Sequence, residues 1–215
     1  MDGSAPLNGE SLKTESLKTG PQITGPLSTG PPSADVPNRE SGNAAARDAG
    51  GEASALEAVE KHHDSMLKRL DALVSVLTHA VKAGNAVAEH DAHGVLLEWC
   101  ETELLPHALA EEGPLYGGVG RGPEGRLLVA ALLAEHQAFV GLIEELRGAN
   151  GVDAAVTAGA IRNIFAGHLD KENRLLLPLI VASPGLSLAQ AVEGLSELVG
   201  EAHVHQSGAG RGGSV

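Results

Sequence analysis

Two short segments of the sequence carry the same pair of chemically active side chains. His107 is followed four residues later by Glu111, and His168 is followed four residues later by Glu172. Residues i and i+4 lie on one face of an α-helix, separated by about 6 Å along its axis. The imidazole and the carboxylate of each pair can therefore point at a single position between helices.

Two further histidines, His63 and His136, occupy comparable positions in two other segments. Each of the four histidines belongs to a stripe of apolar residues with helical spacing. The stripes are Leu56, Val59, His63, Met66, Leu70, Leu73 and Leu77; Leu97, Cys100, Leu104, His107 and Glu111; Leu128, Leu132, His136, Phe139, Ile143 and Leu146; and Ile161, Phe165, His168, Glu172, Leu175 and Leu179. The ionisable groups are therefore expected to face an apolar interior.

Burying these groups without partners is expensive. Each buried ion costs several kcal/mol, whereas a whole domain is stable by only about 5–15 kcal/mol. A bound cation removes this conflict, because metal sites in helical bundles are built from side chains on facing helices. One lone histidine on an apolar stripe is usually a core residue, and a single HxxxE pair is a weak signal. The joint pattern therefore favours a metal centre.

The types of side chain restrict the choice of metal. Four imidazoles and two carboxylates are too many for one tetrahedral zinc ion, and calcium and magnesium prefer oxygen ligands. Mixed nitrogen and oxygen ligation with open positions favours iron, with manganese second. Six ligands divided between two ions, with each glutamate able to bridge them, predict a dinuclear centre that is completed by a bridging oxide or hydroxide.

The elements that position these residues are predicted to be four amphipathic helices. Breaks are expected at residues 82–85, at Gly113-Pro114 with a loop to about residue 125, and after residue 146, where Asp153 could cap the fourth helix. SPG at 183–185 ends that helix. An all-α, antiparallel up-down four-helix bundle over residues 52–182 is the expected fold, with a short fifth helix possible within residues 183–205.

The two ends of the sequence have a different composition. Residues 1–51 are rich in Gly, Pro, Ser and Thr, repeat the unit ESLKT and carry three copies of TGP. So little apolar surface cannot offset chain entropy, which predicts a disordered tail. Residues 206–215 are expected to be a flexible end. The tail offers no visible chemistry, but it could contact a protein partner.

The overall composition excludes several functions. The formal charge of −13 argues against nucleic acid or an anionic membrane surface as a partner, since both require a basic footprint. Cys100 is the single cysteine and cannot form an internal disulfide, which favours a reducing compartment. No signal sequence is evident, and no run approaches the roughly 18 apolar residues of a membrane span. The cytoplasm is therefore the expected location.

The sequence resembles the hemerythrin-like family of HHE cation-binding domains. The similar segments are EKHHDSML at 60–67, PHALAEEGPLY at 106–116, AEHQAFVGLIEEL at 134–146 and GHLDKENRLLLPLI at 167–180. The resemblance implies a four-helix bundle with a di-iron centre that meets O2 or related small molecules. It also implies that His63, His107, His136 and His168 are terminal ligands and that Glu111 and Glu172 are bridges.

Some positions stay open at this point. His62 is a rival to His63, although Met66 and Leu70 follow His63 with the spacing of a buried face. Oxygen-carrying hemerythrins have a further histidine at the position of Val140, so Tyr116 or Glu112 could take that place. The loss of this histidine weakens the case for simple oxygen storage.

The expected function is therefore the sensing or detoxification of O2, NO or peroxide. The alternative is a binding module that responds to iron, or a protein that binds oxygen without turnover. The remaining candidate groups are expected to be peripheral: His79, His90 and His93 at the surface, His203 and His205 in a flexible end, and Cys100 in the core.

Overall fold

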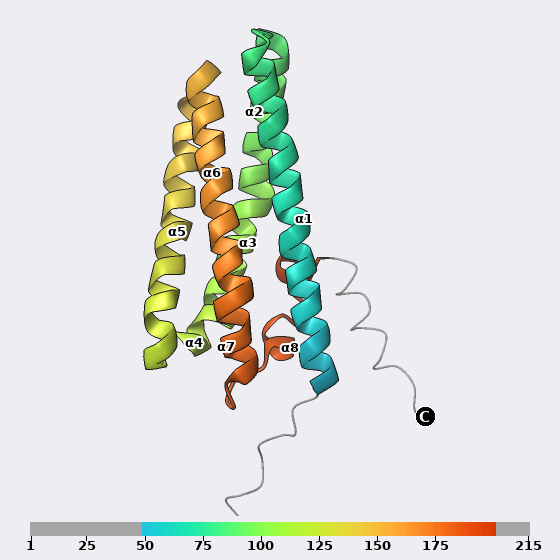
Figure 1. Cartoon of the computed structure of the whole chain (residues 1–215), viewed down its shortest axis with the longest axis vertical. Helices are drawn as coiled ribbons and strands as arrows, with labels where there is room; N and C mark the ends of the chain where they lie inside the picture. Colours follow the sequence, from blue (N-terminus) through green and yellow to red (C-terminus); the bar gives the residue numbers. More distant parts are fainter. Residues whose placement is uncertain (1–48, 201–215) are drawn as a thin grey trace, which may run out of the picture. The chain divides into compact units, whose positions relative to one another are not determined.

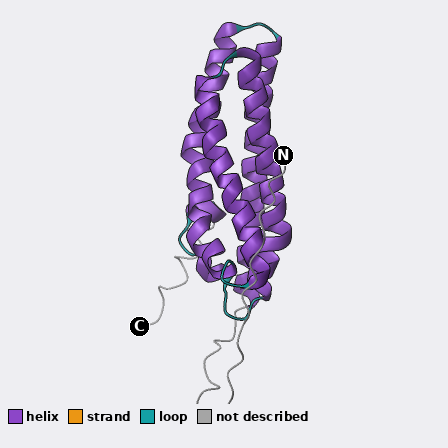
Figure 2. Ribbon diagram, turned by 90° about the vertical axis from the view of Figure 1, so that its left-hand side faces the viewer, coloured by secondary structure: helices purple, strands orange, loops and turns teal. Residues whose placement is uncertain are grey.

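The computed structural model of the chain describes residues 49–200. All regular elements in this range are helical, and Figure 2 shows them as long rods lying alongside one another. The predicted all-α class is therefore confirmed. The predictions for residues 1–48 and 201–215, including most of the tail and the two histidines His203 and His205, lie outside the described residues.

Four long stretches of helix carry the stripes predicted from the sequence (Figure 1). They are α1 (Ala49–Lys82); α2 (Ala86–Trp99) continued by η1 (Cys100–Leu104) and α3 (Leu105–Glu111); α5 (Pro123–Gly148); and α6 (Gly151–Lys171) continued by η3 (Glu172–Leu176) and α7 (Leu177–Ala182). The first stretch packs against the second and the fourth, and the third packs against the fourth. The predicted boundary between the tail and the bundle is at residue 52. Helix α1 begins three residues earlier, at Ala49, and Ala49–Gly51 form part of its first turn.

The residues that begin and end the helices at the turns between these stretches agree only in part with the predictions. Gly84 has a φ of 65° and ends α1, and the Asn85 side chain accepts a hydrogen bond from the Ala88 amide at 3.1 Å to begin α2. Before α6, the Gly151 amide donates to Glu89 Oε1 at 2.6 Å. The proposed cap Asp153 instead lies inside the first turn of α6, so that prediction was wrong.

Three π-helical turns interrupt the regular helices. Pro106 and Pro178 have no amide hydrogen, so neither can donate the usual bond four residues back. Each proline follows such a turn, in which the Leu105 amide bonds to the Cys100 carbonyl and the Leu177 amide bonds to the Glu172 carbonyl, five residues back in both cases. The wider turn accommodates the proline without ending the helix.

The predicted end of the second stretch at Gly113-Pro114 was wrong. The chain stays helical through the π-helical turn η2 (Glu112–Tyr116) and the short helix α4 (Gly117–Val119). Pro114 lies inside η2, where the wide turn tolerates the missing donor. Tyr116 therefore stands on a helical turn and is buried, instead of lying in a surface loop.

After α7 the chain folds back against the first helix. The predicted fifth helix consists of two short turns, α8 (Leu188–Ala191) and α9 (Ser196–Val199), because Gly194 adopts a φ of 80° between them. The buried carboxylate of Glu52 in α1 accepts hydrogen bonds from the Ser187 hydroxyl and, at 2.9 Å, from the Leu188 amide. This contact fixes the C-terminal turns to the start of α1.

The interior contains two apolar clusters. One includes Met66, Cys100 and Phe139, and the other includes Val59 and Leu132. On its stripe, His63 is preceded by Val59, a member of the second cluster, and followed by Met66, a member of the first. On the α5 stripe, His136 likewise comes between Leu132 of the second cluster and Phe139 of the first. The histidines therefore form a polar layer between two dry parts of the core.

Helix α5 is unusually apolar. Among the described helices it is the one whose length and composition would allow it to cross a membrane, with a mean hydropathy of 1.5 over 18 residues. This contrasts with the expectation that no such run exists. The inner side chains of α5, which include Leu132, Phe139 and Ile143, are buried in the bundle, and core helices pass the same test of composition.

Candidate metal centre

All six predicted site residues meet in the polar layer. His63 comes from α1, His107 and Glu111 from α3, His136 from α5, His168 from α6, and Glu172 is the first residue of η3. Each is at most 4% exposed. Their ligand atoms form two groups, each with all atoms within 4.8 Å of one another: His63, His107, Glu111 and Glu172; and Glu111, His136 and His168.

The histidines form two pairs that face the two glutamates. We call His63 and His107 the α1/α3 pair, and His136 and His168 the α5/α6 pair. Glu111 Oε1 lies 3.2 Å from His107 Nε2 and 3.6 Å from His63 Nε2, while its Oε2 lies 3.5 Å from His136 Nε2 and 3.7 Å from His168 Nε2. Glu111 therefore gives one oxygen to each pair.

Glu172 divides its oxygens in the same way. Its Oε2 lies 3.8 Å from His63 Nε2, and its Oε1 lies 3.5 Å from His168 Nε2. Each of the two carboxylates thus has one oxygen near each histidine pair. Ligands that bridge two cations need this arrangement. The HxxxE spacing noticed in the sequence therefore produces convergence on two positions and not on one.

Every histidine of the cluster is held from outside by its Nδ1. The acceptors are Asn173 Oδ1 for His63 at 2.7 Å, the Glu197 carbonyl for His107 at 2.8 Å, Glu112 Oε1 for His136 at 3.0 Å, and Glu135 Oε2 for His168 at 3.0 Å. Because these oxygens can only accept, Nδ1 carries the hydrogen in all four rings. A neutral ring then has a free lone pair on Nε2, as a metal ligand requires.

Four inward atoms have no hydrogen-bond partner although they are buried: His63 Nε2, His107 Nε2, Glu111 Oε1 and Glu172 Oε2. Leaving a buried polar atom unpaired costs about 1–3 kcal/mol, and more for a charged group. All four atoms belong to the same group of potential ligands. A cation at their centre would satisfy all of them, so the residues fit a metal ion.

Tyr116 is the additional member of the cluster. Its hydroxyl donates to Glu172 Oε1 at 2.5 Å and lies 3.1 Å from Glu111 Oε2, 3.2 Å from His136 Nε2 and 3.4 Å from His168 Nε2. Burial and the charges of the two glutamates raise the pKa of the phenol far above its usual range. The phenol oxygen therefore lies beside the α5/α6 pair. The phenol would lose its proton only if a cation compensated the negative charge of the phenolate.

Protons in the cluster are unevenly held. Burial lowers the pKa of His107 to about 4. Burial and the charge of Glu111 raise the pKa of Glu172 to about 7. Burial works in the same direction at Glu111, but the charge of His107 and contacts with His136 and the other histidines, which are positive when protonated, outweigh it and hold its pKa well below the usual range. Glu172 thus titrates near neutral pH when no cation is bound.

The residues whose roles the sequence left open lie at different places relative to the cluster. His62 is half-buried and belongs to neither ligand group; its ring centroid lies 5.4 Å from that of His107. Glu112 contacts His136 from outside the cluster, as given above. Val140 is 46% exposed, so the position of the additional hemerythrin histidine lies outside the polar layer.

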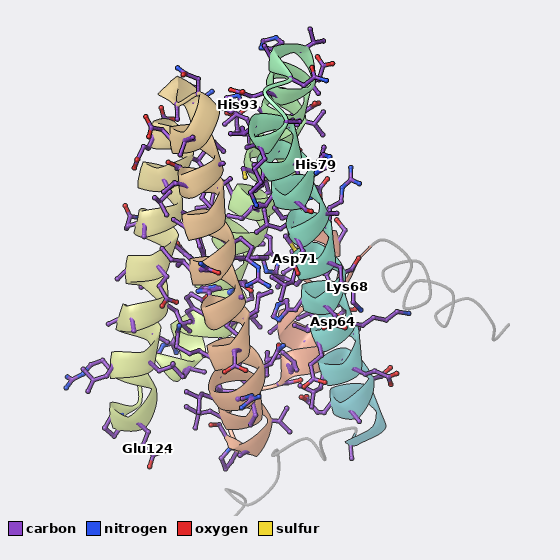
Figure 3. The ribbon with its side chains drawn as sticks, turned by 45° about the horizontal axis from the view of Figure 1, so that its top comes forward. Asp64, Lys68, Asp71, His79, His93 and Glu124 are labelled. Atoms are coloured by element: carbon purple, nitrogen blue, oxygen red, sulfur yellow. The ribbon has the colours of Figure 1, made fainter. Side chains whose placement is uncertain are left out.

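The peripheral groups lie away from the cluster. Figure 3 shows His79 and His93 toward the end of the bundle where α1 meets α2, while Asp64, the neighbour of His63, lies much further along α1. His79 and His90 are exposed, as expected. His93 is half-buried, because its Nε2 donates to the Leu146 carbonyl at 2.7 Å. Cys100 is buried, and burial raises the pKa of its thiol to about 12, which leaves it unreactive.

Comparison with known protein families agrees with this geometry. The family model of the hemerythrin HHE cation-binding domain matches residues 54–180. The chain belongs to the hemerythrin HHE cation-binding family. The comparison with curated proteins gave no significant match, and neither did the comparison with solved structures. The hemerythrin match includes every residue of the buried His/Glu cluster, and it ends before α8 and α9, so the carbonyl that holds His107 lies beyond it.

The outer acceptors of the histidines escaped the sequence analysis, apart from Glu112. Asn173 and Glu135 are each adjacent in sequence to a residue of the cluster, Glu172 and His136. That adjacency was a usable signal. A residue directly before or after a cluster residue can face the adjoining helix and reach a histidine ring on it. The Glu197 carbonyl had no such signal, because any residue has a carbonyl.

Proposed function

We propose that this hemerythrin-like chain is a non-haem di-iron protein that binds or reacts with O2, NO or peroxide, in sensing or in the response to redox or nitrosative stress. The proposed scaffold is an antiparallel up-down four-helix bundle. The observation that carries the proposal is the division of each carboxylate between two histidine pairs, together with four buried ligand atoms that lack partners.

The donor set supports two iron ions above other metals. His63 and His107 would hold one ion, His136 and His168 the other, and Glu111 and Glu172 would bridge them. Imidazole with carboxylate is typical of iron, whereas structural zinc prefers four ligands that often include thiolate. Manganese, which favours more oxygen ligands, is the second choice. Iron bound here would supply electron transfer to a small oxidant.

The surrounding residues would control access and orientation. The apolar clusters on both sides of the layer exclude bulk water, and the outward Nδ1 contacts fix each ring so that Nε2 faces inward. Tyr116 supports chemistry beyond reversible storage, because its hydroxyl, which lies beside His136 and His168, can donate a hydrogen bond or, as phenolate, bind a cation. We therefore rank simple oxygen storage below this function.

Metal content and optical spectroscopy test the proposal. The protein is purified, its iron is counted, and its visible spectrum is recorded oxidised, reduced, and reduced then exposed to air, NO or peroxide. About two iron ions per chain with charge-transfer absorption of a bridged ferric pair are expected. A folded, colourless protein that takes up no iron would disprove the di-iron site. Turnover of peroxide would favour an enzyme, and reversible spectral change without turnover a sensor.

An iron-responsive binding module is the second candidate. One contact favours it: the α9 carbonyl of Glu197 accepts from His107 Nδ1, so metal at His107 would be linked to the C-terminal turns. The test is hydrogen exchange of residues 196–200 with and without iron. Stronger protection with iron, lost in His107→Ala, supports this candidate; equal protection in both forms removes it. A protein partner, reached through the N-terminal tail, would be sought next.

The cytoplasm is the proposed location. Cys100 is a free and buried thiol, which fits a reducing compartment.

A further inference from the structure

An apolar groove lies between α1 and α2, and none of the six cluster residues lines it. The groove has a volume of about 370 Å³ and is lined by Leu73, Val76, Ala88, Asp91, Ala92 and Val95. Val76 is 58% exposed and Val95 is 46% exposed, so both side chains present their methyl groups to solvent. Asp91 is the one charged residue in this lining.

The two valines differ from apolar residues that are scattered singly over a surface. They stand on neighbouring helices and border the same groove, so their side chains form one continuous apolar patch with Leu73. On an exposed helix face valine is a weaker helix former than alanine, and it gains nothing there from burial. Apolar patches with polar residues at their edges are typical of surfaces that contact other proteins.

Two charged residues border this patch. Arg69 lies four residues before Leu73 on α1, and Asp91 lies four residues before Val95 on α2, so each shares a helix face with its apolar neighbour. Both are exposed, and neither forms an ion pair with another residue in the range 49–200. Other arginines of the bundle are paired with carboxylates of their own chain, among them Arg147, Arg162 and Arg174.

The positions of the two charges are related by the direction of the helices. Helices α1 and α2 are joined by the short turn 83–85 and lie side by side, so they run in opposite directions (Figure 1). Arg69 and Asp91 therefore lie on opposite sides of the level of Leu73 and Val95, each about 6 Å away along a helix axis. A two-fold axis across the groove at this level would exchange the two sides.

We propose that the α1/α2 groove binds a second copy of this chain in a two-fold symmetric dimer. Val95 lies beside its own copy near the centre of the contact, and Arg69 of each chain faces Asp91 of the other. Charge complementarity favours this occupant, because one face carries both charges at the positions that a self-complementary contact requires. An apolar centre with charges at its edge is also typical of protein interfaces. The dimer does not depend on the proposed di-iron function.

The test is the mass of the full-length chain in solution, measured by analytical ultracentrifugation from about 1 μM to about 1 mM. Because the groove is small, we expect a monomer–dimer equilibrium with a Kd in the micromolar range. Val95→Asp should weaken association by at least about 100-fold, since it buries an unpaired carboxylate at the centre of the contact. Val140→Asp is the matched control, because Val140 on α5 has the same 46% exposure. It should leave the Kd unchanged.

Two outcomes of this measurement would overturn the proposal. One is a chain that stays monomeric over the whole range of concentration. The other is a Val95→Asp dimer as stable as the unmodified one, which would place the contact on another face.

Charge reversal identifies the facing residues without relying on a loss of association alone. Arg69→Asp and Asp91→Arg should each weaken self-association by about tenfold, because like charges then face each other. An equimolar mixture of the two variants should form a heterodimer as stable as the original dimer, since every facing pair is again of opposite charge. Circular dichroism checks that both variants keep their helices. A mixture that associates no better than either variant alone would contradict the proposed pairing.

Discussion

His107 with Glu111, and His168 with Glu172, are two copies of one arrangement, and a π-helical turn begins directly after Glu111 in the first copy and at Glu172 in the second. In the first copy the residue five positions after the glutamate is Tyr116, and in the second copy it is Leu177. Residues five apart share a face of a π-helical turn, and both side chains are buried. Both pack in the same apolar cluster, but only Tyr116 of the two also reaches the His/Glu cluster, with its hydroxyl.

This comparison shows how a nearly symmetric ligand set becomes unequal. The histidines and glutamates of the two copies have the same spacing and burial. Their surroundings supply the difference: a phenol after one glutamate and a leucine after the other, and carboxylates behind one histidine pair with neutral oxygens behind the other. The asymmetry therefore comes from residues beside the ligands, and it can be changed without removing a ligand.

The largest effect is expected when either copy loses its histidine. His107→Ala and His168→Ala should each lower the iron content to about one ion per chain or less, because each removes one of two terminal nitrogen ligands at its position. Metal affinity should fall by more than the roughly 10–100-fold seen for outer contacts. Elemental analysis after dialysis gives the result.

The matched control for this prediction is His62→Ala. His62 lies beside the cluster but in neither ligand group, so its removal should leave about two iron ions bound. If His62→Ala loses iron as fully as His107→Ala does, the assignment of His63 as the ligand of α1 is wrong.

The second largest effect should distinguish Tyr116 from Leu177. Tyr116→Phe keeps the ring and removes the hydroxyl, so Glu172 loses its hydrogen-bond donor and the metal-free protein should lose about 1–3 kcal/mol of stability. In the iron-loaded protein, any phenolate-to-iron absorption should disappear. Denaturant unfolding and visible spectroscopy measure the two effects.

Leu177→Met is the companion variant, since it conserves volume and has no donor. It should cost less than about 1.5 kcal/mol and leave the spectrum unchanged. A spectrum that survives Tyr116→Phe intact would show that the phenol is not a ligand.

An intermediate effect concerns pH and the two bridging glutamates. The pKa of Glu172 is raised to about 7, so below that pH a proton must leave before a metal binds, whereas the pKa of Glu111 is held low. Burial would lower the pKa values of His63 and His168, but contacts with Glu111 and Glu172 outweigh it and raise them, so these rings also release protons, and metal affinity should rise with pH through about 7 and beyond. For one released proton the change is about tenfold per pH unit. Calorimetric titration in buffers of different ionisation enthalpy counts the released protons, and an affinity independent of pH between 5 and about 7 would contradict this expectation.

The smallest effect is expected at the position where oxygen-carrying hemerythrins have another histidine. Val140 is half-exposed on the outer side of α5, so Val140→His should neither bind iron nor alter the spectrum. Stability should change by no more than about 0.5 kcal/mol, as for other surface substitutions. A new ligand signal, or a spectrum closer to that of an oxygen carrier, would mean that α5 turns when metal binds.

The helical stripes were sufficient to find the six buried residues of the candidate site, because a period of 3.6 residues places His63, His107, His136 and His168 on inner faces. The same period could not place Tyr116. Counted from Glu111 with regular helical spacing, it falls on another face, and only the extra residue of the π-helical turn moves it inward. Pro114, which lies inside that turn, was the available signal.

The outer contacts depend on tertiary structure and could not be derived from periodicity. Glu135 meets His168 across two helices, and Asn173 meets His63 across a sequence separation of 110 residues. Adjacency to a cluster residue indicates that Asn173 and Glu135 lie near the site, but local spacing does not show which histidine each of them contacts. The charge of the outer acceptors, which distinguishes the two histidine pairs, therefore became visible only in the folded chain.

The contact between the Glu197 carbonyl and His107 has a consequence for biosynthesis. The two residues are 90 positions apart, so the ring receives its acceptor only after α9 has left the ribosome. At about 5–20 residues per second, this interval lasts several seconds. For the last 25 of these residues, between Glu172 and Glu197, the nascent chain already has all six cluster residues in sequence while the ring of His107 still lacks its Nδ1 acceptor. We therefore expect the cluster to reach its final geometry only after the α9 segment has been made, however early the six residues themselves are synthesised.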